Sequence, residues 1–444
     1  MSKYNLKCTK CNHITPDYKT WFANNQKCPE CGSNYSKVEY TEGVNELKNI
    51  IYAKAGKSFL DIYFDYLPLN DRKNIVTEGE GLIPVDDCDT LTELTKRTGL
   101  KNTKVFIYRN DKNPGTGTFK DVAAALAASI LKENGIKEYC IASTGNIATA
   151  FAYYLAKAGI SLSVFIPQDA LMANEAEVSV YGQRVYRVKG DYAKAKKIAA
   201  EYAAKYNILM SGGNVDPARV EAKKTMVFEW IRQMDTFPTV YIQALSGGTG
   251  PIAIDKALND IKSLKLVDHY PRYIMVQPSN CDPMTQAWEK AKANGFPEGW
   301  ETDYPIIDNP VTEVPTLATG NPATYPIIAS LVKKSKGEII NFDEAEIYDI
   351  ARLVAYETGV RVGPASTIAL GGFLKSLQKG LIKDNDLVLI NVGEGVRRAP
   401  KFKEELIYTT VEIDSIDDCQ LFNRNDIKEQ LWNKFDKYIL KPKS

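Results

Sequence analysis

The stretch Asn113-Pro114-Gly115-Thr116-Gly117-Thr118-Phe119-Lys120-Asp121 is a glycine-rich turn that leads into an alanine-rich segment, 121–133, with one lysine at the junction. Glycine lets the backbone approach a ligand closely, and the N-terminus of a helix favours an anion. A lysine that is half-buried in such a place can lose its proton and form a Schiff base with an aldehyde. Alone, the stretch also fits the commoner case of an exposed lysine at a helix start, so its meaning depends on the rest of the chain.

Two further loops follow predicted strands and precede predicted helices. Ser246-Gly247-Gly248-Thr249-Gly250-Pro251 comes after the apolar run 240–245, and it offers backbone amides and two hydroxyls to a phosphate. Ser143-Thr144-Gly145-Asn146 comes after the run 139–142, and its hydroxyls and amides suit a carboxylate and a phenolic oxygen. Ligands bind where such loops meet at one edge of an α/β sheet. The three stretches together therefore predict one ligand site.

Short β-rich runs alternate with helical stretches from residue 103 onward. This alternation predicts an α/β protein with parallel sheets that helices cover on both faces. A chain of 444 residues is too long for one ordinary core, so more than one such domain is expected. The charged and aromatic tail 401–444 fits either an extra packed helix or a subunit contact. The predicted strands are 105–108, 139–142, 162–166, 184–188, 240–245, 273–276 and 387–391.

Composition and charge exclude several classes of function. Lysine and arginine number 56 against 55 aspartates and glutamates, so no net charge draws the chain to nucleic acid or to a membrane. No apolar run approaches the roughly 20 residues of a membrane helix, and no apolar segment of signal-peptide length opens the chain. A cytoplasmic location is therefore expected. His13 and His269 are the only histidines and neither lies in a motif, so the general base is expected elsewhere.

Four cysteines form two Cys-x-x-Cys pairs near the N-terminus: Cys8, Cys11, Cys28 and Cys31. Two tight turns at this spacing bring four thiolates together, as tetrahedral zinc requires. So short a segment buries little core, and a bound metal would supply its folding free energy. We predict a structural zinc ribbon within residues 1–42, with four reduced cysteines and no metal as the alternative. No position is left for a water ligand, so catalysis at this zinc is not expected.

Several motifs occur in an order that points to a family. The lysine stretch resembles Asn-Pro-Thr-Gly-Ser-Phe-Lys-Asp with one glycine inserted, and 142–146 is similar to that family's asparagine loop. Asp216-Pro217-x-Arg219-x-Glu221-x-x-Lys224-Thr225 resembles Asn-Pro-x-Arg-x-Glu-Gly-Gln-Lys-Thr. On these matches, the chain from about residue 75 to residue 400 resembles threonine synthase, one of the fold-type-II pyridoxal-phosphate enzymes. Further ordered matches are Gly79-Glu80-Gly81-x-x-Pro84, Thr319-Gly320-Asn321-Pro322 and Pro364-Ala365-Ser366.

The resemblance implies an architecture and a role for each matching residue. Two doubly wound parallel-sheet domains would follow the ribbon: a large cofactor-binding domain, 43–135 and 236–400, and a small domain, 136–235. Lys120 would bind pyridoxal 5'-phosphate covalently and move protons on the substrate. The other implied contacts are Asn146 to the cofactor's phenolic oxygen; Ser246, Gly247, Gly248, Thr249 and Gly250 to its phosphate; Ser143, Thr144 and Gly145 to the substrate carboxylate; and Asn214 and Arg219 to the substrate phosphate.

The chain departs from the family pattern at positions that adjoin this pocket. Val392 stands where the family presents a threonine or serine to the pyridine nitrogen, and valine has no hydrogen-bonding group in its side chain. Asn391 or Glu394 would take its place as a cofactor contact, unless the nitrogen meets water. Gly363 replaces the glutamate that usually precedes Pro-Ala-Ser, and Gly213 replaces a phosphate-binding asparagine. Changes confined to the pocket indicate a shifted substrate.

Three functions remain open from the sequence. The first is threonine synthase, which makes L-threonine from O-phosphohomoserine and water. The second is a relative that eliminates phosphate from O-phosphoserine and adds another nucleophile, as cysteate synthases do with sulfite. The third is an inactive scaffold that acts as a binding protein, which the presence of Lys120, Asn146 and the 246–250 loop disfavours. Both enzyme hypotheses imply a small phosphorylated amino acid as partner, and the resemblance adds a homodimer as an expectation.

Overall fold

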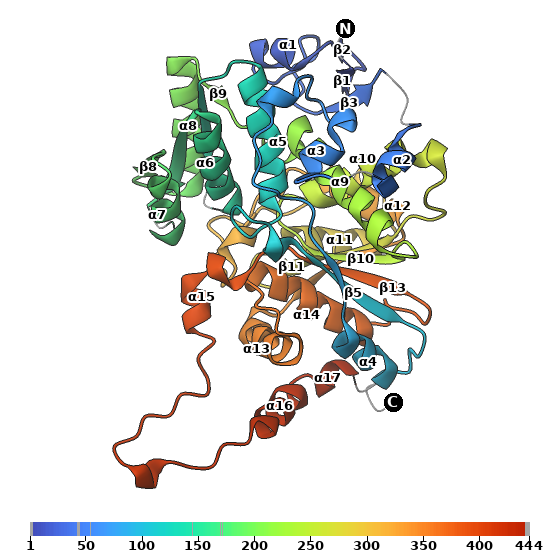
Figure 1. Ribbon diagram of the computed structural model, residues 1–444, viewed down its shortest axis with the longest axis vertical. Helices are drawn as coiled ribbons and strands as arrows, with labels where there is room; N and C mark the ends of the chain where they lie inside the picture. The colour runs from blue at the N-terminus through green and yellow to red at the C-terminus, as the bar shows by residue number, and fades with distance from the viewer. Residues whose placement is uncertain are drawn as a thin grey trace.

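Three sheets organise the protein in the computed structural model, which describes residues 3–41, 45–53, 55–143, 145–168, 170 and 172–439. Figure 1 shows a smaller α/β unit beside α5, a larger sheet below it, and the N-terminal module on top of the helices that cover the larger sheet. Helices lie on both faces of the two larger sheets. The α/β prediction is thereby confirmed.

The largest sheet has the strand order β12-β11-β10-β13-β5-β4. Its strands run parallel, as predicted, except that β4 pairs antiparallel with β5 at the edge. Successive side chains enter different cores: Tyr241 packs with α9 and α10, whereas Ile242 belongs to the core beneath α13 and α14. The strands are β4 (Val85–Asp87), β5 (Lys104–Arg109), β10 (Val240–Ala244), β11 (Arg272–Pro278), β12 (Glu338–Phe342) and β13 (Leu387–Val392).

The smaller sheet has the order β8-β7-β6-β9, and each neighbouring pair of its strands is parallel. Its strands are β6 (Glu138–Ala142), β7 (Ser161–Pro167), β8 (Arg184–Val188) and β9 (Leu209–Met210). The helices of the two α/β units are α4 (Asp89–Arg97), α5 (Lys120–Glu133), α6 (Asn146–Ala158), α7 (Met172–Val180), α8 (Tyr192–Tyr206), α9 (Pro217–Gln233), α10 (Thr249–Asp260), α11 (Pro283–Ala293), α12 (Tyr325–Lys334), α13 (Ile347–Thr358) and α14 (Pro364–Gln378).

The N-terminal module is a small antiparallel sheet of order β2-β1-β3 with one short helix. Tyr40, at the end of β3, donates a hydrogen bond of 2.5 Å to the Glu221 carboxylate on α9, so the module is fastened to a helix that packs on α10. The elements of this segment and of the connector after it are β1 (Tyr4–Cys8), β2 (Ile14–Thr15), α1 (Tyr18–Ala23), β3 (Ser36–Tyr40), α2 (Leu47–Ala53) and α3 (Phe59–Ile62).

The C-terminal segment leaves the body after α15 (Pro400–Glu404), runs through an exposed irregular stretch and returns (Figure 1). Its last helices, α16 (Arg424–Asn433) and α17 (Asp436–Ile439), pack on α13 and α14. The sequence left two roles open for this tail, an extra packed helix or a subunit contact. The structure shows the first of them. Among the described residues, no helix combines the length and apolar character needed to cross a membrane.

Candidate active site

Lys120 is the first residue of α5, and the turn before it is held against the loop that follows β13. The Phe119 amide donates a hydrogen bond of 3.1 Å to the Gly393 carbonyl. Burial and, after it, the charge of the Arg219 guanidinium lower the pKa of Lys120 to about 8, although the Glu394 carboxylate opposes the shift. An amine with this pKa is partly neutral near physiological pH, which is the form that attacks an aldehyde.

The 246–250 loop connects β10 to the N-terminus of α10 and forms a backbone cradle. Gly248 has a φ of +74°, and a Cβ at this position would lie 2.3 Å from Cδ1 of Ile328. Any other residue would displace the Ile328 side chain and would adopt a backbone conformation that favours glycine. A hydrogen bond also stabilises the loop, since the Ser246 and Thr319 hydroxyls are 2.7 Å apart. Gly248 is the N-cap residue of α10 and provides no side-chain cap, and open amides at a helix start suit a phosphate.

Asn146 and Glu394 form a buried pair beside Lys120. The Asn146 amide group donates to one oxygen of the Glu394 carboxylate, and the Ala365 amide donates to the other at 2.8 Å. A Cβ on Gly363 would lie 3.2 Å from the second oxygen, so the missing side chain leaves the space that this carboxylate occupies. Burial raises the pKa of Glu394. The Oδ1 atom of Asn146 has no hydrogen-bond partner among the described residues and is available to a ligand.

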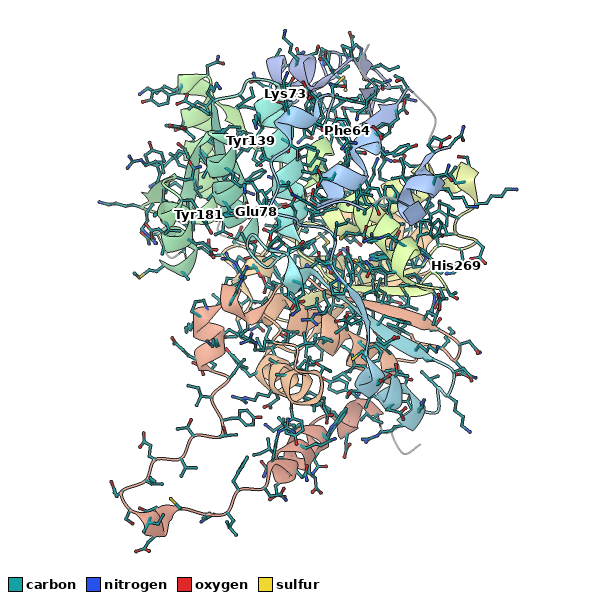
Figure 2. The ribbon with its side chains drawn as sticks, in the orientation of Figure 1. Phe64, Lys73, Glu78, Tyr139, Tyr181 and His269 are labelled. Carbon is teal, nitrogen blue, oxygen red and sulfur yellow. The ribbon has the colours of Figure 1, made fainter. Side chains whose placement is uncertain are left out.

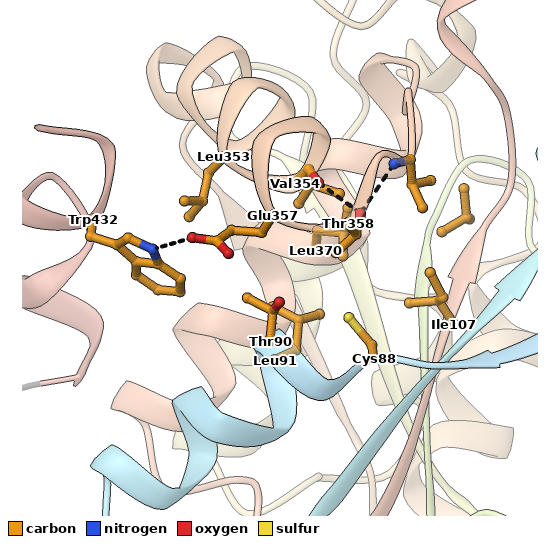
Figure 3. Close-up of a pocket in the computed structure, with 12 residues that line it drawn as sticks. Cys88, Thr90, Leu91, Ile107, Leu353, Val354, Glu357, Thr358, Leu370 and Trp432 are labelled. Carbon is orange, nitrogen blue, oxygen red and sulfur yellow. Dashed lines mark hydrogen bonds between the residues drawn. The ribbon is translucent and has the colours of Figure 1, made fainter. Parts of the chain in front are cut away.

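Val392 does not face this pair. Its buried side chain lines an apolar pocket that also includes Trp432 and lies between α4, α13 and α16 (Figure 3). The Asn391 side chain is already engaged, since its oxygen accepts a hydrogen bond of 2.7 Å from Asn110. Asn391 and Glu394 were the two predicted replacements for the missing threonine or serine. Of these, Glu394 is the one whose charge affects the pKa of Lys120.

The predicted carboxylate loop lies at the N-terminus of α6. The Gly145 amide donates a hydrogen bond of 3.2 Å to the Ser143 hydroxyl. Gly145 is the N-cap residue and provides no side-chain cap, so the first amides of the helix are free to bind an anion. Thr144 lies outside the described residues.

Arg219 and Asn214 flank the start of α9. The Oδ1 atom of Asn214 accepts a hydrogen bond of 3.2 Å from the Thr249 hydroxyl, so Asn214 adjoins the backbone cradle. Arg219 is 5% exposed and donates to the Ser211 hydroxyl. Its Nε lies 3.8 Å from the Asp216 carboxylate and lacks a hydrogen-bond partner among the described residues. Asn214, predicted for the substrate phosphate, thus lies beside the loop that is predicted for the cofactor phosphate.

Lys223 is a buried residue of this site that the sequence analysis did not single out. Its Nζ lies 3.9 Å from the centre of the Phe119 ring, and Nζ of Lys120 lies 4.3 Å from the same centre. A signal was present in the sequence, because Lys223 follows Arg219 by four residues and such residues share one face of a helix. Nothing in the family motif marks that position as basic.

Neither histidine belongs to the site. His13 lies in the N-terminal module beside Glu30. The His269 ring is 3.1 Å from the Pro238 carbonyl, which precedes β10 and therefore lies at the opposite end of that strand from the cradle. Figure 2 shows His269 at the edge of the molecule. The base must be another group, as the sequence indicates.

The four N-terminal cysteines converge as predicted. Their Sγ atoms all lie within 4.8 Å of one another, and the closest pairs, Cys8 with Cys31 and Cys11 with Cys28, are 3.5 Å apart. Four thiolates at such separations match the ligand set of a tetrahedral zinc ion.

Comparisons with known proteins agree with this geometry. A family model described as "Pyridoxal-phosphate dependent enzyme" matches residues 76–393. The threonine synthase of Methanocaldococcus jannaschii is 27% identical over 390 residues, which cover 84% of this chain and 92% of that protein. The threonine synthase of Synechocystis is 28% identical over 365 residues, 79% of this chain and 90% of that protein. Among solved structures, maize serine racemase aligns with a TM-score of 0.58 at 18% identity, over 73% of this chain and 92% of that one.

Proposed function

Because the chain belongs to the family of pyridoxal-phosphate dependent enzymes, we propose that it is a threonine synthase, which converts O-phosphohomoserine and water into L-threonine and phosphate. The observation that carries the proposal is the buried Arg219, whose Nε has no hydrogen-bond partner among the described residues and whose charge lowers the pKa of Lys120. A guanidinium in that place suits a substrate that brings its own phosphate, because it binds and orients that group. The similarity to threonine synthases supports the same conclusion.

The residues present fit the cofactor at three points. Lys120 has a half-buried amine with a lowered pKa, and Asn146 has an Oδ1 atom without a partner and a second amide hydrogen to donate. The 246–250 loop leads into α10 at Gly248, which provides no side-chain cap, so the first amides of that helix suit the cofactor phosphate. Pyridoxal phosphate bound there would supply the electron sink for the charge that forms at the substrate Cα.

The chain's own residues would then bind the substrate and move protons. Ser143 and the first amides of α6 would hold the substrate carboxylate, which fixes the orientation of Cα. Lys120 would take the proton from the substrate Cα and return it at the end of the reaction. Between these two steps, Cβ would lose one proton and Cγ would gain one. Arg219 would stabilise the charge on the phosphate as the Cγ–O bond breaks. Water adds its hydroxyl at Cβ, which completes threonine.

Phosphate release from two substrates tests the proposal. The cofactor-loaded protein is incubated with O-phosphohomoserine, or with O-phosphoserine plus sulfite, and free phosphate and the amino-acid product are measured. We expect equal amounts of phosphate and threonine from O-phosphohomoserine. Turnover of O-phosphoserine and not of O-phosphohomoserine would instead identify a cysteate synthase-like enzyme, and no turnover of either would favour the inactive scaffold.

Replacement of Arg219 by alanine tests its role directly. We expect KM for the phosphorylated substrate to rise about 10- to 100-fold, since a hydrogen bond to a charged group contributes about 1.5–3 kcal/mol. The visible absorbance of the bound cofactor should persist, because Arg219 is not needed to bind it. Arg184→Ala, on the exposed edge of the small sheet, is the matched control. Unchanged kinetics for Arg219→Ala would mean that this side chain does not contact substrate.

A further inference from the structure

Lys223 is the exception among the buried charges of α9. Glu221 and Lys224 pair with each other at 2.5 Å, Lys224 also contacts Asp260 at 3.2 Å, and Glu229 pairs with Arg232. Lys223 is only 1% exposed, yet within the part of the chain that the structure describes no carboxylate pairs with its amine. Burial of an amine without an anionic partner is unfavourable, so its retention calls for another explanation than stability.

The surroundings of this amine are basic. Lys120 is a hydrogen-bonding neighbour of Lys223, and both amines lie over the Phe119 ring. Burial first, then the charges of Lys120 and Arg219, lower the pKa of Lys223 well below its usual value. Two acids act on this group of bases: Glu394 on Lys120, and Asp216, whose carboxylate lies 3.8 Å from Nε of Arg219. Neither acid acts on Lys223, so among the described residues this amine has only basic charged neighbours.

We propose that Lys223 and Arg219 form a two-point subsite for a tetrahedral dianion beside Lys120, and that Lys223 makes the enzyme selective for substrates bearing such a group. That this dianion is the phosphate of a substrate rests on the proposed function. Arg219 and Lys223 are four residues apart, so their side chains project from one face of α9 toward the same space. The motif that this stretch resembles has glutamine at position 223, so the second cation is a feature of this chain.

The two side chains contribute differently to the subsite. Arg219 is always charged and has a free Nε donor. Lys223 gains its proton when the dianion arrives, because a nearby negative charge favours the ammonium form. A dianion therefore binds together with a proton, whereas a monoanionic or neutral group does not recruit the second cation. This difference is the source of the selectivity.

Sulfate binding to the cofactor-loaded enzyme tests the subsite without turnover. Sulfate is a tetrahedral dianion whose charge does not change between mildly acid and mildly alkaline pH. By calorimetry, we expect Lys223→Met to bind sulfate about 10- to 100-fold more weakly than the wild type. Wild-type affinity should fall as pH rises, since the ammonium form is lost, and the affinity of Lys223→Met should depend much less on pH. Lys197→Met, an exposed lysine on α8, is the matched control.

Stability separates this role from a structural one. Methionine matches the length of the lysine stem and removes an unpaired buried amine, so Lys223→Met should unfold at the wild-type temperature or above it. A lack of sulfate binding by the wild type overturns the proposal, and so do unchanged affinity or unchanged pH dependence in the variant. If Lys223→Met and Lys223→Gln both fail to fold, Lys223 is structural and the proposal also falls. If sulfate binding depends on Lys223 but O-phosphohomoserine is not turned over, the subsite stands and the proposed function does not.

Discussion

Replacement of Lys120 by alanine will abolish turnover and remove the visible absorbance of the bound cofactor, while the protein remains folded. We expect the loss of activity to be about 10³-fold or more, because removal of a covalent catalyst eliminates a whole reaction path. The fold should survive, since alanine is a good first residue for α5 and the lysine makes no salt bridge with a described residue. Absorbance, circular dichroism and phosphate release measure the three effects. The control is Lys132→Ala, at the exposed end of the same helix.

The pH dependence of cofactor loading adds a second measurement on Lys120. Only the neutral amine reacts with an aldehyde, and the pKa of Lys120 is about 8. Reconstitution of the cofactor-free protein should therefore speed up as pH rises toward that value and slow about tenfold per unit below it. Arg219→Ala removes a cation that lowers this pKa, so its profile should move to higher pH. A profile that follows an ordinary exposed lysine, or an absorbance band that survives in Lys120→Ala, would contradict the assignment.

Local motifs made most of the architecture predictable. The strand runs at 105–108, 240–245 and 387–391 are apolar on both faces, as buried parallel strands are, and all three are strands in the structure. β4 was missed because Val85–Asp87 is short and carries two aspartates, so neither periodicity nor β-propensity marks it. Its place at the sheet edge is set by pairing with β5, which is a tertiary contact.

The candidate site was also predictable only where a local sequence motif marks it. The lysine turn, the 246–250 cradle and the loop before Asn146 each carry a local signal, since each is a polar turn between a strand and a helix. The relation between Gly363 and Glu394 has none: the departure from the family pattern at Gly363 leaves the space that the carboxylate of Glu394, a candidate cofactor contact, occupies. Such a compensation depends on distance in space, which sequence spacing does not give.

Loss of the N-terminal metal should have the largest effect on stability. We expect one zinc ion per chain, and we expect Cys11→Ser or a strong chelator to remove it and to unfold the module, because bound zinc contributes about 10–16 kcal/mol to the folding of comparable small units. Metal analysis gives the stoichiometry and thermal unfolding gives the loss of stability. Cys419→Ser, an exposed cysteine in the C-terminal segment, should change neither.

We expect loss of the metal to affect the active site as well, because of where the module is attached. Tyr40 binds Glu221 on α9, and the Gln26 side chain binds the Met210 carbonyl, next to the Ser211 hydroxyl that holds Arg219. Without the expected metal these two attachments should loosen, and α9, which carries Arg219, should lose its outer support. KM for the phosphorylated substrate should therefore rise, while Lys120, which is held by the 393–395 loop, retains the cofactor absorbance. A metal-free variant with unchanged KM and unfolding temperature would show that the four cysteines do not support the site through a bound ion.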